Sequence, residues 1–319
     1  MLSTYSRDEG HFPQSRLVVM TAFVCLLLVS STAYAQSTYG TVLGTVKDPS
    51  GSAIPKAIVE LLNVGTNSTR TATTNENGNY QFVNVDQGMY QIKATAPGFD
   101  TVEFTSFEMA ARDTKRFDAD LKVATQATVV TVEAASVLQT ETSSVAYTKG
   151  SLELTNLPVA IGSRSTGSTS AFSTLTAQPG VQIDSQNNIT VAGATTSQLS
   201  FSIDGISSVG PGATAGPLTE LFPSFNAIEE IRISENLNPA EYGGVADVTT
   251  VSKSGTNAFH GGAFENLQNN DFNAADTFSH TTPVIKLNDF GIYLGGPVIL
   301  PKIYDGHNKT FFFGSFERL

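Results

Sequence analysis

Residues 41–121 are divided into short segments in which apolar and polar residues alternate, and a turn residue ends each segment. Gly, Pro, Asn or Asp recurs roughly every 8–12 residues, which is the spacing of strands in a β-sandwich. Charged residues make up only 15% of the chain, so long helices, whose faces need Glu, Lys and Arg, are disfavoured. The pattern therefore predicts a mainly β fold that begins with a sandwich.

The N-terminus carries the features of an export signal. Residues 17–29 are a short apolar run, with Arg16 before it and Ala33-Tyr34-Ala35 after it. A membrane anchor needs roughly 20 apolar residues, so this run is too short for one. We expect residues 1–35 to be a signal peptide that is cleaved between Ala35 and Gln36. The single cysteine, Cys25, lies inside this run, so we expect no disulfide, thiolate metal site or cofactor in the exported protein.

The charge of the chain excludes one class of partner. Its net charge is −11 and its Lys and Arg residues are not clustered. Binding to nucleic acid requires a basic face that neutralises phosphates, so we expect no nucleic-acid partner.

Four segments of the first region resemble the carboxypeptidase regulatory-like module. They are Gly44-Thr45-Val46-Lys47-Asp48, Ile54-Pro55-Lys56-Ala57, residues 74–82 and Tyr90-Gln91-Ile92-Lys93-Ala94. The resemblance implies a transthyretin-like sandwich over residues 40–122, classed with carbohydrate-binding-like folds and without peptidase activity. Within it, Asn75-Glu76-Asn77-Gly78 is typical of a hairpin turn, with Gly78 at positive φ. A calcium loop is the alternative, although Asn75 and Asn77 bring no formal charge.

Residues 123–149 form a linker rich in Thr, Val, Ala and Ser. Within it, Thr128, Val129, Val130, Thr131 and Val132 resemble the TonB box of TonB-dependent receptors. Such a box must be extended and able to add as a strand to the sheet of its partner, and β-branched residues meet that requirement. The resemblance implies the TonB–ExbB–ExbD complex as a partner. The alternative is that these residues are the last strand of the sandwich.

Residues 150–257 predict a small α/β domain whose motifs resemble the plug of TonB-dependent receptors. In order they are Gln178-Pro179-Gly180-Val181, Ile203-Asp204-Gly205-Ile206, residues 228–233, Ala240-Glu241-Tyr242-Gly243 and residues 248–257. Asp204 is expected to be a turn residue. Glu229 and Arg232 are candidates for ion pairs between plug and barrel. The Gly-rich loop after Ile206 is a candidate ligand contact, because ligands are often bound by exposed loops. Its candidate residues are Ser207, Ser208, Gly210 and Gly212.

Residues 258–319 predict transmembrane β-strands, in which outward apolar residues alternate with small or polar inward ones. The candidate strands are residues 259–265, 290–297 and 309–317, and the region resembles Oar-like receptors. A closed barrel needs at least ~8 strands, and an open sheet edge cannot span lipid. We therefore expect a truncated product or a partial record, with only the first strands of an incomplete barrel.

No motif indicates an enzyme: the four histidines are scattered, and neither a nucleophile elbow nor a phosphate-binding loop is found. Two functions remain. One is TonB-dependent uptake of a nutrient, such as a carbohydrate, across the outer membrane, which makes outer-membrane lipid a further partner. The other is a carbohydrate-binding module, periplasmic or at the cell surface, from a truncated gene. The predicted location is the outer membrane, or the periplasm if the chain is truncated.

Overall fold

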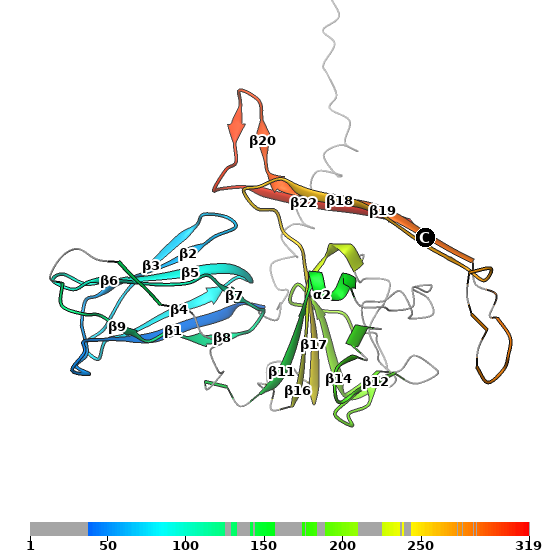
Figure 1. The fold of residues 1–319 in the computed structure, drawn as a ribbon, viewed down its shortest axis with the longest axis horizontal. Coiled ribbons are helices and arrows are strands. Elements are labelled where there is room, and N and C mark those ends of the chain that lie inside the picture. Colours follow the sequence, from blue (N-terminus) through cyan, green and yellow to red (C-terminus); the bar gives the residue numbers. More distant parts are fainter. Residues whose placement is uncertain are drawn as a thin grey trace, which may run out of the picture. The chain divides into compact units, whose positions relative to one another are not determined.

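The computed structural model describes residues 38–124, 129–132, 141–142, 144–156, 174–175, 177–183, 189–209, 225–236, 238, 244–272, 274–275, 277–282, 284 and 286–318. Strands predominate in this part of the chain, which confirms the expected mainly β fold (Figure 1). No helix among these residues is long and apolar enough to cross a membrane. The predicted cleavage site at Ala35 and Gln36 lies outside the described residues.

The first region is a sandwich of two sheets. One sheet has the order β4-β1-β8 with β9 also pairing with β1, and the other has the order β10-β6-β5-β2-β3 with β7 also pairing with β5. The strands are β1 (Gly40–Lys47), β2 (Ile58–Asn63), β3 (Thr69–Thr73), β4 (Asn79–Val85), β5 (Gly88–Thr95), β6 (Thr101–Phe104), β7 (Phe107–Met109), β8 (Thr114–Arg116), β9 (Ala119–Asp120) and β10 (Val129–Val132).

The alternation in the sequence determines which side chains fill the sandwich. In β5, for example, Tyr90, Ile92 and Ala94 are buried, because successive side chains of a strand point to opposite faces. They pack in one core with residues from both sheets, such as Val42 and Phe82. This burial supplies the main stabilisation of the region.

The turn at Asn75 connects β3 of one sheet to β4 of the other, so the prediction of a hairpin is wrong, although the turn is tight. The Asn75 side-chain oxygen accepts hydrogen bonds from the backbone amides of Asn77 (2.9 Å) and Asn79 (3.0 Å). Gly78 adopts a φ of 73°, which a glycine tolerates without steric cost. The Asn75 side chain and the positive φ of Gly78 therefore close the turn.

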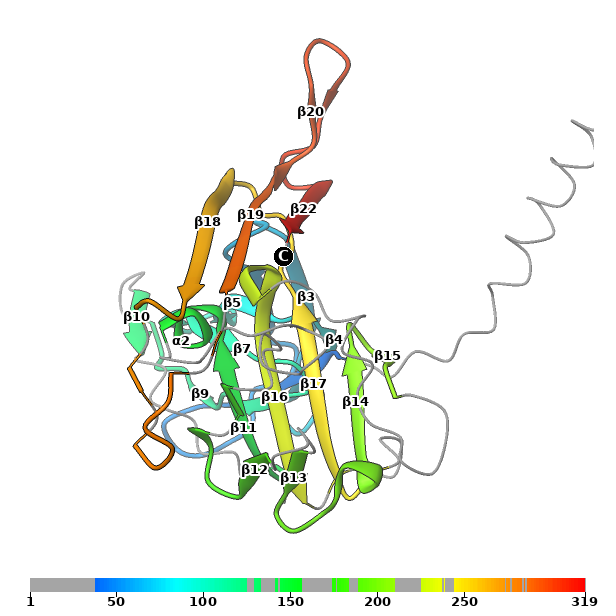
Figure 2. The same cartoon turned by 90° about the vertical axis from the view of Figure 1, so that its right-hand side faces the viewer.

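The central domain, residues 144–257, is built on a mixed sheet with the order β11-β16-β17-β14-β15. Figure 2 shows β16, β17 and β14 side by side. Of these neighbours only β14 and β17 are parallel. The elements are β11 (Val145–Gly150), α2 (Ser151–Asn156), β12 (Val181–Ile183), β13 (Ile189–Val191), η4 (Thr196–Gln198), β14 (Leu199–Ile203), β15 (Ile206–Ser207), η6 (Phe225–Ala227), β16 (Ile228–Asn236) and β17 (Ala246–Ser252).

This domain has its own core, separate from that of the sandwich. Phe201, Ile231 and Val248 are among its fully or almost fully buried side chains. Asp204 has a φ of 48° and occupies the turn between β14 and β15, as predicted. Its carboxylate also accepts hydrogen bonds from the backbone amide (2.8 Å) and hydroxyl (2.7 Å) of Ser252, which tie the turn to the end of β17.

The C-terminal sheet consists of three antiparallel strands, β18 (His260–Asn269), β19 (Lys286–Pro297) and β22 (Phe311–Arg318). A hairpin of β20 (Ile299–Leu300) and β21 (Tyr304–Asp305) joins β19 to β22. Each candidate strand of the sequence analysis is found, and the pairing of β18 with β19 continues without a register shift for the length of β18. The sheet is open in this chain, as expected for part of a barrel.

Candidate functional site

The candidate TonB box lies at the edge of the sandwich. Val129–Val132 form β10, which pairs in parallel with β6, and the amide of Thr105 donates to the carbonyl oxygen of Val132 (3.0 Å). Thr128 lies outside the described residues. The observed strand matches the alternative that these residues close the sandwich. Because a TonB box must also be an extended strand, its function as a box stays a prediction.

Arg232 contacts the sandwich through the turn between β7 and β8. Its guanidinium donates to the carbonyl oxygen of Ala111 (2.9 Å) and forms an ion pair with Asp113 (3.1 Å), and both charged side chains are buried. The prediction of an ion pair between plug and barrel is therefore wrong for Arg232. A partner 119 residues earlier in the chain left no local pattern from which it could be found.

The same turn places a second cation against the central sheet. Arg112 forms an ion pair with Asp247 on β17. Asp247 is buried and also accepts hydrogen bonds from the hydroxyls of Ser200 (2.5 Å) and Thr249 (2.7 Å). The backbone of Arg112 is left-handed, with a φ of 59°. Non-glycine residues adopt this conformation at an energetic cost, and such residues are enriched at functional sites. Sequence reasoning did not identify Arg112 or Asp247.

Glu230 completes this contact. Its carboxylate accepts a hydrogen bond from the backbone amide of Ala111 (2.5 Å). Burial raises the pKa of Glu230 to about 7, although the Ala111 amide and the charge of Arg232 act in the opposite direction. We call Arg112, Asp113, Glu230, Arg232 and Asp247 the docking cluster.

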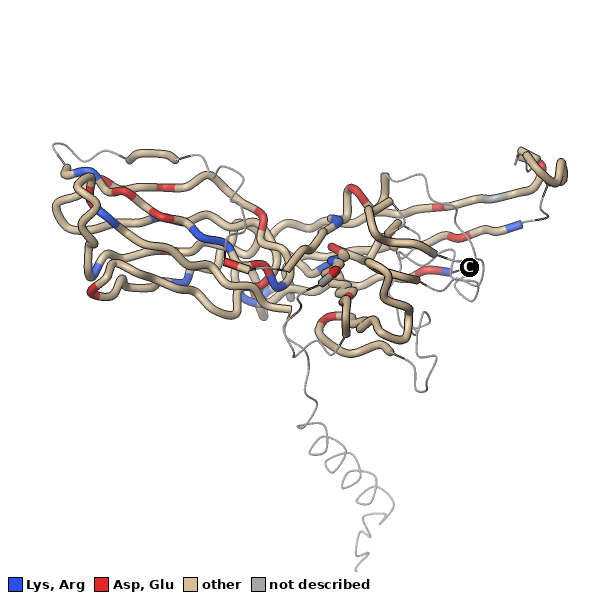
Figure 3. The backbone as a smooth tube through the Cα atoms, turned by 90° about the horizontal axis from the view of Figure 1, so that it is seen from below, with Lys and Arg blue, Asp and Glu red and all other residues tan. Residues whose placement is uncertain are grey.

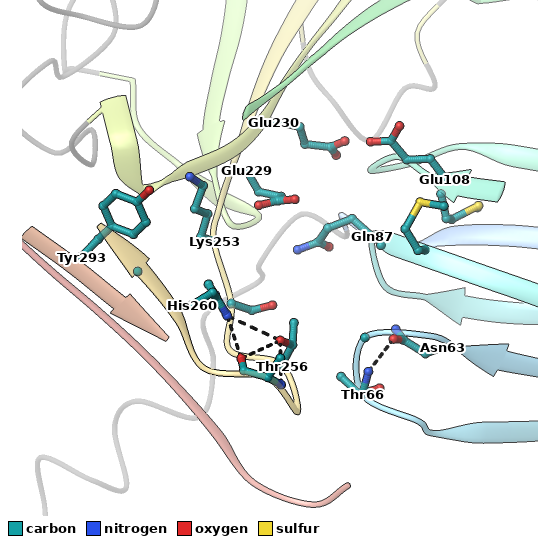
Figure 4. Close-up of a pocket in the computed structure, with 17 residues that line it drawn as sticks. Asn63, Thr66, Gln87, Glu108, Glu229, Glu230, Lys253, Thr256, His260 and Tyr293 are labelled. Atoms are coloured by element: carbon teal, nitrogen blue, oxygen red, sulfur yellow. Dashed lines mark hydrogen bonds between the residues drawn. The ribbon is translucent and has the colours of Figure 1, made fainter. Parts of the chain in front are cut away.

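A cavity of about 510 Å³ lies beside the docking cluster (Figure 4). Among the labelled polar side chains, Asn63, Gln87 and Glu108 come from the sandwich and Glu229 comes from β16. Lys253 directly follows β17, and His260 begins β18. The ammonium group of Lys253 lies 4.9 Å from the centre of the Tyr293 ring, and burial lowers the pKa of Lys253. Among the described residues, no cluster of three His, Cys, Asp or Glu side chains is arranged to hold a metal ion. Three carboxylates, those of Glu108, Glu229 and Glu230, line the cavity with one lysine, Lys253, so the lining disfavours an anion.

The candidate ligand loop is described only in part. Ser207 is exposed at the end of β15, whereas Ser208 is buried and its amide donates to the carbonyl oxygen of Phe201 (2.9 Å). Gly210 and Gly212 lie outside the described residues. Acidic and basic residues are interspersed along the strands of the sandwich (Figure 3).

Comparison with known proteins adds to this geometry. Residues 41–122 match the carboxypeptidase regulatory-like domain, and residues 251–319 match an outer membrane beta barrel domain. The TonB-dependent transporter Oar of Myxococcus xanthus is 24% identical over 295 residues, which cover 87% of this chain. These matches support a relationship of the chain to TonB-dependent receptors of the outer membrane. The chain spans about a quarter of the length of that relative, 27%.

The similarities of this chain to solved structures are weaker. The siderophore receptor PirA from Acinetobacter baumannii has a TM-score of 0.35 and 20% identity, over 48% of this chain and 22% of that chain. The Bacillus anthracis TIE protein has a TM-score of 0.25 and 18% identity, over 27% of this chain and 17% of that chain. Neither is close enough to carry an argument about this chain.

Proposed function

We propose that this chain acts in the TonB-dependent uptake of a nutrient across the outer membrane. In this proposal residues 1–35 direct export, residues 150–257 are the plug, and TonB of the TonB–ExbB–ExbD complex binds residues 128–132. The Oar of Myxococcus xanthus is a TonB-dependent transporter, which supports the proposal.

The observation that carries the proposal is the two-faced C-terminal sheet. In β19 the side chains of Phe290, Ile292 and Leu294 are exposed, whereas the alternate residues Asp289 and Gly291 are buried and Tyr293 is half-buried. The pairing of Ile292 with Phe316 extends this apolar face onto β22. A strand that spans a membrane turns apolar side chains to lipid and polar or small ones to the interior, so the face suits a lipid environment.

Deletion of residues 128–132 tests the proposal. We expect the deletion to abolish uptake while the receptor still reaches the outer membrane, because the segment lies outside the strands that would contact lipid. A matched control replaces Thr128 and Thr131 with Val, which keeps the β-branched, extended character. Growth on the transported nutrient and the receptor content of the outer-membrane fraction are the measurements. Unimpaired uptake by the deletion variant would contradict the proposed role of this segment.

Carbohydrate binding by the sandwich is the second candidate. The amides of Asn63 and Gln87 and the carboxylate of Glu108 line one side of the cavity, and groups of this kind hydrogen-bond to hydroxyls. Retention of the exported chain on a polysaccharide resin, lost when Gln87 and Glu108 are replaced by Ala, would support it. Passage through the resin without delay would exclude it.

A further inference from the structure

β10 is an edge strand with one side open. In the sheet order β10-β6-β5-β2-β3, β6 is the only described strand that pairs with β10. The N–H and C=O of one strand residue point to the same side, and those of its neighbours point to the opposite side. Since the Val132 carbonyl bonds to Thr105 of the β6 side, the backbone groups of Val130 also face β6. Those of Val129 and Thr131 face the open edge.

The side chains of β10 divide in a similar way. The register pairs Val130 with Val102 and Val132 with Phe104, and both partners are buried in the sandwich core. Val130 is half-buried and Val132 is exposed, while Thr131, paired with Glu103, lies on the other, outer face of the sheet and is exposed. The segment is already extended, in register and fixed on one side.

We propose that TonB adds a strand to the open edge of β10 while β10 stays paired with β6, so that the sandwich presents the TonB box in its binding conformation. The inference rests on the proposed function and specifies how the box is bound. An exposed edge strand offers unpaired backbone groups to an incoming strand. A segment that is already ordered avoids the conformational entropy that a free peptide loses on binding. The sandwich is then a platform for its partner rather than a separate module.

A disulfide between β10 and β6 provides the test. Glu103 and Thr131 are paired on the outer face, and the only cysteine of the chain, Cys25, lies in the predicted signal peptide. The E103C/T131C variant of the exported chain, in detergent, is oxidised and its binding to the purified C-terminal domain of TonB is measured. We expect the cross-link to form and the affinity to be the same in the oxidised and reduced protein. Thermal unfolding of the reduced variant checks its fold.

A proline pair tests which backbone groups TonB uses. Thr131→Pro removes an N–H that faces the open edge and should weaken TonB binding about tenfold. Thr131→Val keeps that N–H and should bind as the unmodified chain does. A synthetic peptide of residues 126–134 should bind roughly tenfold more weakly than the whole chain, because it must be ordered on binding.

The outcomes separate the two proposals. If the reduced protein and the peptide bind TonB but the oxidised protein does not, β10 must leave β6, and the presentation of the box is overturned while the proposed function stands. Failure of the cross-link to form also overturns it. If neither the peptide nor any form of the chain binds TonB, the proposed function fails, and the inference fails with it.

Discussion

The sandwich and the C-terminal sheet are made of similar strands that differ in what covers them. β5 and β19 both alternate apolar with polar or small residues. Ile92 of β5 is fully buried by the second sheet of the sandwich, whereas Ile292 of β19 is 60% exposed. Alternation therefore indicates which residues share a face of a sheet. Whether the apolar face stabilises the fold in water or in lipid depends on what covers it, a second protein layer or the membrane.

A matched pair of isoleucines should show the largest difference. Ile92→Ala removes buried methyl and methylene groups and should lower the free energy of unfolding of the sandwich by about 2–5 kcal/mol. Ile292→Ala removes the same groups from an exposed face and should cost less than about 1 kcal/mol in detergent solution. Equilibrium urea unfolding of both variants measures the difference. Equal losses would mean that the outer face of β19 is covered in the way the sandwich core is.

Two arginine variants, one on each face of the C-terminal sheet, test which face contacts lipid. In a bilayer, Ile292→Arg on the outward face should cost up to about 4 kcal/mol, since arginine near the midplane of a barrel is expensive. Ser315 pairs with Tyr293 on the opposite face, so Ser315→Arg should have little effect on stability. Unfolding of the receptor in phospholipid vesicles is the measurement. A comparable cost for both variants would contradict the assignment of the outward face to lipid.

The docking cluster between the sandwich and the central domain consists of charged side chains that are mostly buried. The stability of the chain should therefore depend on pH. The pKa of Glu230 is raised to about 7 from the ordinary 4.5 by burial. An acid with a raised folded-state pKa contributes stability below pH 4.5 that is lost as the pH rises towards 7. The difference corresponds to about 3 kcal/mol. Thermal unfolding should therefore shift downward between pH 5 and pH 8.

Glu230→Gln should reduce this pH dependence, because an amide cannot ionise. Glu76→Gln, in the exposed turn after Asn75, should follow the unmodified chain and serves as the control. An unchanged pH dependence in Glu230→Gln would show that Glu230 does not govern the contact.

Local patterns were sufficient for most of the strands but not for the partners of those strands. The strands of the sandwich are indicated in the sequence by alternation and by turn residues, such as Asp48-Pro49 after β1 and Asn77-Gly78 before β4. β7 and β8 have three residues each, which is too short for an alternation to be recognised. The parallel pairing of β14 with β17, such as Phe201 with Val248, joins segments far apart in the sequence. Nothing in either segment specifies that pairing.

The same limit applies to the candidate site. The β-branched residues 128–132 were recognised because their own composition favours a strand. Arg112 and Asp247 were not identified because they are significant only as an ion pair, and the two residues are 135 positions apart in the sequence. A left-handed arginine also has no signature in the sequence, since glycine and asparagine are the residues that normally indicate this conformation. Extended segments can thus be predicted from their own residues, whereas the distant residues that they contact cannot.

Two glycines should respond in opposite directions to the addition of one methyl group. A Cβ at Gly78 would lie 2.5 Å from the carbonyl oxygen of Val46, and the φ of Gly78 is 73°. Gly78→Ala should therefore destabilise the sandwich by about 2 kcal/mol. Gly314 in β22 has no atom within 4 Å of its would-be Cβ. Because glycine is costly inside a strand, Gly314→Ala should stabilise the C-terminal sheet by about 0.5 kcal/mol. If Gly314→Ala proved destabilising in lipid, other protein atoms would have to pack closely against the outward face of β22.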